Sequence, residues 1–190
     1  YLLIEADAIA NTAKKLDENE VEKAFMILKN CIKNKGKLIT SGVGKSGIVA
    51  RKIAATFSSI GFMSIYLNPL DALHGDIGIV NNGDVCLLLS NSGETSELLE
   101  ILPHLKQRQT ECIAITGEKN SSLAKQSDVF INAQVDKEIC PLNLAPTTST
   151  TVSMAIGDAL ASAWMDKNNI SSEQFAFNHP AGSLGRKLTI

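Results

Sequence analysis

Apolar side chains follow two different spacings along the chain. From Val21 to Ile32 they recur every three or four residues, which predicts a helix that ends near Gly36. Residues 1–16 are compatible with a further helix. Beyond Gly36, short continuous apolar runs predict buried strands. These runs lie at residues 37–40, 63–67, 85–89, 112–116 and 129–133.

Helical patterns separate the apolar runs, at about 46–60, 95–108 and 122–126. A long helix is predicted after Pro146, and a short helix over 172–177 precedes a Gly-rich tail at 180–186. The inner positions of the long helix would be Val152, Ala155, Ile156, Ala159, Leu160 and Ala163. Continuous apolar strands that alternate with helices are typical of a parallel sheet covered on both faces. We therefore predict an α/β three-layer sandwich.

No internal repeat or low-complexity segment divides the 190 residues, which are enough for one domain with a sizeable core. We predict a single domain over 1–190, with N-terminal helices at 1–36, strand–helix alternation at 37–135, and C-terminal helices and tail at 147–190. Residues 71–76 are expected to form a polar loop between the second and third strands.

Two short turns have the composition of phosphate-binding sites. The first, Thr40 to Gly47, reads T-S-G-V-G-K-S-G, and the second, Ser90 to Thr95, reads S-N-S-G-E-T. Each turn follows a predicted strand and leads into a predicted helix, whose free N–H groups and dipole attract anions. Four hydroxyl or amide side chains in the second turn exceed what a simple helix cap needs. The two turns together indicate a small phosphorylated ligand.

The glycines of the first turn could serve the geometry of the turn alone. Three functional interpretations are also possible. A P-loop is excluded, because the first glycine of that motif would fall at Ile39. The spacing G-x-G-x-x-G at 42–47 matches a dinucleotide site, but the acidic residue that such a site needs is absent from the end of the second strand, and Asp71 is the nearest. The third interpretation is a sugar-phosphate turn, with Ser46 donating to phosphate and Lys45 reaching the sugar.

Charge and hydropathy narrow the class of partner. The formal net charge of −2 and the lack of any Lys/Arg block give no sign of nucleic-acid binding. No apolar run approaches the ~18 residues that a membrane span requires. The first residues lack a basic segment and a long apolar stretch, so they do not form a signal peptide. Tyr1 stands where a whole chain would begin with Met, as in a fragment of a longer chain.

Cysteine and histidine spacing gives no metal site. The four cysteines contain no Cys-x-x-Cys pair, which favours buried, reduced thiols in a cytosolic protein. The three histidines lie far apart, so we expect no metal and no other cofactor. His104, in the middle of a predicted helix, is expected at the surface.

Five charged or titratable side chains are candidates for chemistry: Lys45, His74, Glu97, Glu138 and His179. Each also has an ordinary explanation. Glu97 lies in the first turn of a helix, where a carboxylate complements the dipole. His74 lies in a polar loop, Glu138 precedes a proline-bounded loop, and His179 stands beside a proline where a helix stops.

The chain resembles the D-arabinose-5-phosphate isomerase family, whose members carry a sugar isomerase (SIS) domain, from about Val21 onward. The two phosphate turns are general to SIS domains, whereas the contexts of Lys45, His74, Glu138 and His179 are narrower. The motifs that carry the resemblance are G-V-G-K-S-G at 42–47, H-G-D at 74–76, S-N-S-G-E at 90–94, A-P-T at 145–147, G-D-A-L at 157–160, H-P at 179–180 and L-G-R-K-L at 184–188. Family members often continue into paired CBS domains, whereas this sequence stops at Ile190, as a short form or a cut chain would.

The resemblance implies a five-stranded parallel sheet of the flavodoxin-like SIS type and a homotetramer. It implies interconversion of D-ribulose 5-phosphate and D-arabinose 5-phosphate, the entry to 3-deoxy-D-manno-octulosonate (KDO) and lipopolysaccharide. The five candidates above would be the catalytic cluster, with His179 reaching a neighbouring subunit's site. The implied phosphate ligands are Ser46, Ser90, Asn91, Ser92 and Thr95, and further substrate contacts are expected from Gly44, Thr147 and Thr148.

Aldose–ketose isomerisation proceeds by a metal-assisted hydride shift or through a cis-enediol with a general base. The sequence favours the enediol route, because no metal-ligand spacing is present. Glu138 or Glu97 is the candidate base, with a pKa raised by partial burial. Lys45 or a histidine would stabilise the enediolate oxygen, and His74 or His179 would move the hydroxyl protons.

Three alternatives stay open. Another SIS isomerase, for a heptose or hexulose phosphate, would share both phosphate turns. A sugar-phosphate sensor would need no catalytic cluster and commonly a fused DNA-binding element, which residues 1–36 do not resemble. A dinucleotide-binding protein would bind NAD(P)H.

Overall fold

Five parallel strands form one sheet in the order β2-β1-β3-β4-β5. The computed structural model describes residues 1–180, so the Gly-rich tail expected beyond Pro180 lies outside the described residues. The strands are β1 (Leu38–Gly42), β2 (Ser64–Tyr66), β3 (Val85–Leu89), β4 (Glu111–Thr116) and β5 (Val129–Asn132). The predicted α/β class with a parallel five-stranded sheet is confirmed.

The chain leaves β1 in one direction to reach β2 and then returns to the other side of β1 for β3, β4 and β5. Leu38 therefore pairs with both Ser64 of β2 and Val85 of β3. In open parallel sheets, such a reversal leaves a crevice at the carboxyl ends of the two strands between which the order reverses, here β1 and β3. Ligands bind in this crevice. The fold thus directs attention to the ends of β1 and β3.

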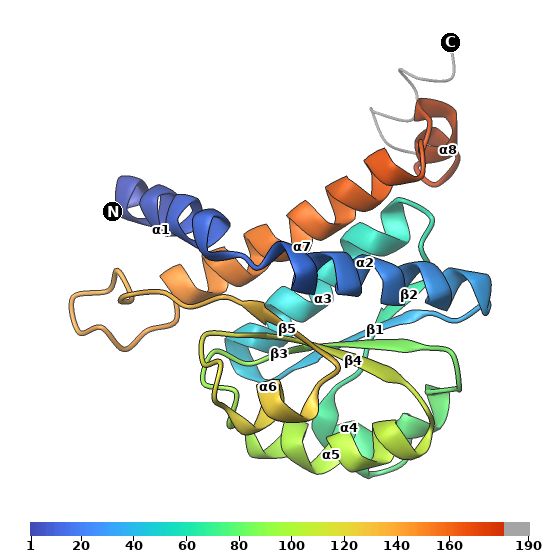
Figure 1. Cartoon of the computed structure of the whole chain (residues 1–190), viewed down its shortest axis with the longest axis horizontal. Helices are drawn as coiled ribbons and strands as arrows, with labels where there is room; N and C mark the ends of the chain where they lie inside the picture. The colour runs from blue at the N-terminus through green and yellow to red at the C-terminus, as the bar shows by residue number, and fades with distance from the viewer. Residues whose placement is uncertain (181–190) are drawn as a thin grey trace.

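Helices cover both faces of the sheet (Figure 1). One face carries α2 (Glu18–Lys33), α3 (Gly44–Ser59) and α7 (Thr148–Lys167), with α1 (Leu2–Lys15) and α8 (Ser172–Phe177) attached to this layer. The other face carries α4 (Pro69–Leu73), α5 (Ser96–Gln107) and α6 (Ser122–Gln126). Within the part of the chain that the structure describes, no helix has the length and hydropathy needed to cross a membrane.

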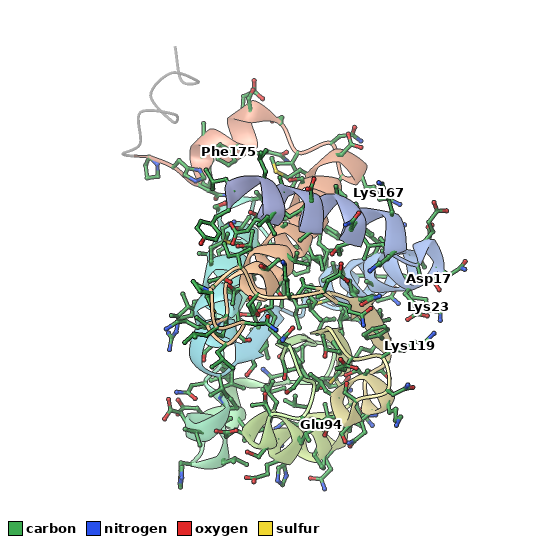
Figure 2. The ribbon with its side chains drawn as sticks, turned by 90° about the vertical axis from the view of Figure 1, so that its left-hand side faces the viewer. Asp17, Lys23, Glu94, Lys119, Lys167 and Phe175 are labelled. Carbon is green, nitrogen blue, oxygen red and sulfur yellow. The ribbon has the colours of Figure 1, made fainter. Side chains whose placement is uncertain are left out.

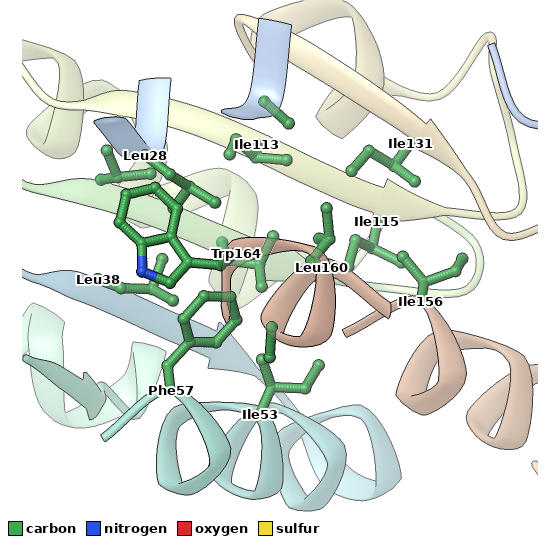
Figure 3. Packing of buried hydrophobic residues seen from close by; sticks show 14 of the residues in the cluster. Leu28, Leu38, Ile53, Phe57, Ile113, Ile115, Ile131, Ile156, Leu160 and Trp164 are labelled. Atoms are coloured by element: carbon green, nitrogen blue, oxygen red, sulfur yellow. The ribbon is translucent and has the colours of Figure 1, made fainter. Parts of the chain in front are cut away.

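Helices α3 and α7 pack side by side with their N-termini at the same end of the molecule (Figure 1). A side chain at Gly157 would lie 2.4 Å from Ile53, so the absence of a Cβ lets the two helices approach closely. Figure 3 shows Ile53 and Phe57 of α3 facing Leu160 and Trp164 of α7 beneath the sheet. This packing places the start of α7 beside the start of α3.

The structure corrects three expectations. The supposed polar loop at 71–76 is wrong: Asn68 caps the short helix α4, Pro69 opens it, and a 3₁₀ turn, η1 (Asp76–Ile79), follows. Strand β1 extends to Gly42, so helix α3 begins at Gly44 rather than near residue 46. Among the expected inner positions of α7, Ala159 is exposed.

Gly36 takes part in the expected helix stop, because its N–H donates to the carbonyl oxygen of Cys31 at 2.8 Å. The left-handed residue after α2 is Lys35, with φ of 58°. A Cβ at Gly36 would lie 2.1 Å from the carbonyl oxygen of Gly83, so the glycine permits two backbone segments to touch.

Candidate functional site

A pocket of about 290 Å³ opens where the structure brings the ends of β1 and β3 against the start of α7. We call it the β1/β3 pocket. Its lining comes from three segments that lie far apart in the sequence. The lining residues are Val43, Lys45, Ser46, Val49, Asn91, Glu138, Asn143, Leu144, Pro146, Ser149, Thr150 and Ser153.

The first phosphate turn is the junction of β1 and α3. Gly44 has φ of 58°, a left-handed conformation that glycine adopts without strain. A Cβ at Gly47 would lie 2.7 Å from the carbonyl oxygen of Gly42, so both glycines allow α3 to begin directly against the strand end. Lys45 and Ser46 consequently lie in the first helical turn, beside free N–H groups and facing the pocket.

The second phosphate turn is held by its own side chains. Ser90 is 3% exposed, its hydroxyl is 2.8 Å from that of Thr95, and it accepts the N–H of Gly93 at 2.9 Å. Ser92 accepts the N–H of Glu94 at 3.2 Å. Of the four expected phosphate ligands in this turn, Asn91 alone lines the β1/β3 pocket. The hydroxyls of Ser90 and Thr95 instead shape the turn.

Glu138 reaches the pocket from the loop that precedes α7. Its Oε2 accepts the backbone N–H of Thr147 at 2.7 Å and that of Ser149 at 3.2 Å, and its Oε1 accepts the Ser149 hydroxyl. The carboxylate therefore occupies the N-terminus of a 20-residue helix, where the dipole favours negative charge.

The pKa of Glu138 departs from the expectation. Burial by itself would raise the pKa, but hydrogen bonds from Ser149 and Thr147 outweigh it, and the pKa lies below its usual value. The pKa of Glu97 is also lowered, by its own backbone N–H and by the hydroxyl of Ser96. The prediction of a raised pKa for either glutamate is therefore wrong in this structure, because both accept hydrogen bonds as anions.

Not all expected site residues meet in this pocket. Lys45, Ser46, Asn91 and Glu138 line it, and Thr147 touches it indirectly by donating its hydroxyl to Glu138 at 3.0 Å. The expected residues that do not line it are Gly44, His74, Ser90, Ser92, Thr95, Glu97, Thr148 and His179. Thr148 is 1% exposed and instead borders a separate pocket of about 150 Å³ against α1. His74 is exposed after α4, a helix that packs on α5 in the opposite layer.

His179 lies far from the β1/β3 pocket within the chain. It follows α8, where its ring stacks on Phe175 at 4.0 Å and its Nδ1 lies 2.7 Å from the Phe175 carbonyl oxygen. The 20 residues of α7 span about 30 Å between this end and Glu138. Figure 2 shows Phe175 at one end of the molecule and Glu94, in the second phosphate turn, at the other. Within the chain, His179 and the β1/β3 pocket therefore lie at opposite ends of α7.

The sequence identified Glu138, Thr147 and Thr148 in this region, but four polar residues that line the pocket were missed. Ser149, Thr150 and Ser153 line the pocket, and Asn143 lines it from the loop. The signal was present, since residues 147–151 read T-T-S-T-T at a helix start, the same kind of hydroxyl-rich N-terminus as the second turn. Among residues 1–180, no group of three or more His, Cys, Asp or Glu side chains is placed to hold a metal ion.

Comparison with known proteins shows a family match and similar proteins that cover nearly the whole chain. A family model for the SIS domain matches residues 31–163. Arabinose 5-phosphate isomerase KpsF of Escherichia coli O6:H1 is 46% identical over 181 residues, which are 95% of this chain and 54% of that protein. Arabinose 5-phosphate isomerase KdsD of Pseudomonas aeruginosa is 43% identical over 187 residues, 98% of this chain and 56% of that protein. The chain thus spans about half the length of the curated relatives it matches.

A solved structure matches over nearly its whole length. The c3406 protein of E. coli CFT073, in complex with arabinose 5-phosphate, superposes with a TM-score of 0.85 at 40% identity. The match covers 94% of this chain and 93% of that chain.

Proposed function

The chain belongs to the SIS domain family, and on that basis we propose that it is an isomerase that interconverts D-ribulose 5-phosphate and D-arabinose 5-phosphate. The observation that carries this proposal is the convergence of Lys45, Ser46 and Asn91 with the carboxylate of Glu138 in one pocket. Relatives named arabinose 5-phosphate isomerase, at 43–46% identity, support the choice of substrate pair.

The phosphate end of the sugar is assigned to the α3 side of the pocket. Free N–H groups of the first turn of α3, the hydroxyl of Ser46 and the amide of Asn91 are donors that suit phosphate oxygens. Lys45 adds a positive charge in a protein whose net charge is −2. Phosphate binding there would hold the sugar so that its carbonyl end extends toward Glu138.

The chemical step moves one proton between C1 and C2. A base removes the proton from the carbon next to the carbonyl, the electron pair passes to the carbonyl oxygen, and a cis-enediolate forms. Returning a proton to the other carbon, with the matching shift of hydroxyl protons, completes the isomerisation. Glu138 is the better placed base within a protomer because it lines the pocket as an anion, whereas Glu97 does not line it. Lys45 would stabilise the enediolate oxygen.

We further propose a homotetramer in which His179 completes the site of a neighbouring subunit. The position of His179, about one α7 length from its own Glu138, supports this arrangement, because a residue that acts in this pocket from that end must come from another copy. Roles for His74 and Glu97 stay predictions. We place the enzyme in the cytoplasm, where its phosphorylated substrates are made, as the isomerase that begins KDO synthesis for lipopolysaccharide.

Proton NMR in deuterium oxide tests the proposal directly. The chain is incubated with D-ribulose 5-phosphate in the presence of EDTA, and the spectra are followed with time. Appearance of D-arabinose 5-phosphate deuterated at C2 supports both the substrate pair and the enediol route. Binding of ribulose 5-phosphate without conversion would indicate a sugar-phosphate sensor or an isomerase for another phosphosugar. The absence of both conversion and binding would overturn the proposal.

A further inference from the structure

Asn143 occupies an unusual backbone conformation at the edge of the β1/β3 pocket. Its φ is 52°, in the left-handed region that asparagine tolerates better than most residues. Its side chain lines the pocket from the loop between Glu138 and Thr147, across from Lys45 and Ser46 on α3. Nothing in the sequence marked this residue for function.

The hydrogen bonding of Asn143 determines which way its amide points. Its Oδ1 accepts the backbone N–H of Glu138 at 2.7 Å. An N–H can only donate, so the oxygen must face Glu138, and the NH₂ group must lie on the other side. Among the described residues, no hydrogen-bond partner of this NH₂ group is found within the chain. Because Asn143 is exposed and lines the pocket, its NH₂ group is a neutral donor available at the loop side.

Hydrogen bonds within the loop that carries Asn143 restrain its conformation. The N–H of Asn143 donates to the carbonyl oxygen of Cys140 at 2.9 Å. The N–H groups of Leu144 and Ala145 both donate to the Cys140 sulfur at 3.1 Å. The loop ends at Thr147, whose N–H is held by Glu138. An amide presented from such a loop loses less conformational entropy on binding than one on a free loop.

The polar groups of the pocket divide into two sides. Ser46, Asn91 and the start of α3 offer donors suited to phosphate, whereas Glu138, as an anion, can only accept hydrogen bonds. Lys45 is the donor proposed for the carbonyl oxygen, and the hydroxyl oxygens of the sugar on the loop side can accept hydrogen bonds as well, from a donor that Glu138 does not provide. The amide of Asn143 is such a donor.

We propose that Asn143 is a substrate-binding residue whose side-chain N–H donates to a sugar oxygen at the end remote from the phosphate. This inference rests on the proposed function and deepens it, because it identifies the group that distinguishes a phosphosugar from phosphate alone. Asn143 thereby serves two ends at once: its oxygen orients the backbone of Glu138, and its nitrogen contacts the substrate.

Two substitutions separate these roles. N143D keeps an oxygen for the Glu138 N–H but replaces the donor with a negative charge. N143G keeps the left-handed backbone and removes the amide. The matched controls are N169D and N169G, because Asn169 is exposed with a φ of 50° and lies beyond α7, outside the pocket. Melting temperatures of all four variants establish that each protein is folded.

Isomerisation kinetics with D-ribulose 5-phosphate and competitive inhibition by inorganic phosphate give the readout. N143G is expected to lower kcat/KM about 5- to 10-fold, the value of one hydrogen bond, mainly through KM. N143D should lower kcat/KM further, by about 30-fold or more relative to the parent, because its charge faces an anionic ligand. The inhibition constant for phosphate in N143G should stay within about twofold of the parent, as should every constant of the Asn169 variants.

Parent-like KM in N143D would overturn the inference, because the loop contact alone would then account for any effect of N143G. Equal weakening of phosphate and phosphosugar binding in N143G would also overturn it, since a collapsed loop would disturb the whole pocket. Failure of the proposed function is a separate result: the parent protein itself would then not convert ribulose 5-phosphate, whether or not it bound this sugar.

Discussion

The carboxylate of Glu138 accepts the backbone N–H of Thr147 at 2.7 Å, so the side chain proposed as the base also caps the helix that follows it. The N–H of Ser149 donates to the same oxygen at 3.2 Å. A capping carboxylate is ionised and held in a fixed orientation, both of which suit a base. The same contacts lower its pKa and hence its strength as a base.

Replacing Glu138 with glutamine should therefore damage catalysis far more than folding. E138Q keeps an oxygen that can cap α7 but removes the anion that would take the proton from carbon. We expect turnover of D-ribulose 5-phosphate to fall by a factor of ~10² or more. E20Q is the matched control, because Glu20 accepts the N–H of Phe130 at 3.3 Å outside the pocket. Equal activity of E138Q and E20Q would remove Glu138 from the mechanism.

The lowered pKa of Glu138 predicts how stability depends on pH. A carboxyl whose pKa is depressed on folding contributes stability above its unfolded value of about 4.3 and loses it as pH falls through the folded pKa. The difference in melting temperature between the parent and E138Q should be constant from about pH 8 to pH 5 and shrink at more acid pH. A difference that instead grows on acidification would contradict the direction of the shift.

Complementation between two inactive variants tests the contribution of His179. K45A removes a group from one end of the protomer and H179A from the other. If His179 serves a neighbour's pocket, unfolding and refolding the two variants together should restore activity, to about a quarter of the parent sites for random mixing. Two variants that stay inactive after co-refolding, although each assembles normally, would show that no such exchange occurs.

Close packing of α3 on α7 at Gly157 is expected to exclude a larger side chain at this position. A Cβ there would lie 2.4 Å from Ile53 on α3, so G157A should destabilise the protein by about 1–3 kcal/mol in urea unfolding. The double variant I53V/G157A should recover part of the loss, since valine lacks the terminal methyl of isoleucine. Gly78 has no heavy atom within 4 Å of its Cβ position, and G78A serves as the control.

Gly93 combines a left-handed backbone with a close contact in the second phosphate turn. Its φ is 66°, and a Cβ would lie 2.1 Å from the Ser121 hydroxyl oxygen. G93A should cost about 2 kcal/mol or more of unfolding free energy and weaken phosphate inhibition. Gly61 shares the left-handed φ, at 86°, but its nearest contact is 3.5 Å away, so G61A should cost only about 1 kcal/mol. Similar losses in both variants would show that backbone strain, not contact, dominates.

Much of the fold could be predicted because its signals are local. The apolar run at 85–89 located β3, and the short helices predicted at 122–126 and 172–177 coincide with α6 and α8, since helix and strand propensities act over a few residues. Residues 71–76 were misjudged as a loop, although Asn68 and Pro69 are a local start signal for α4 that was not weighed. Coverage of residues 1–190 by a single domain stays a prediction.

The candidate site also has one part that local sequence predicts and another that depends on tertiary contacts. A strand, a glycine turn and a helix start are contiguous, so the sequence by itself determined that Lys45 and Ser46 would lie at a helix N-terminus suited to phosphate. Only the tertiary structure decided that Glu138 and Asn143 face them and that His179 does not. That choice depends on the reversal of strand order at β1 and on the close packing of α7 on α3 at Gly157. These contacts join segments distant along the chain, and local spacing of residues carries no information about them.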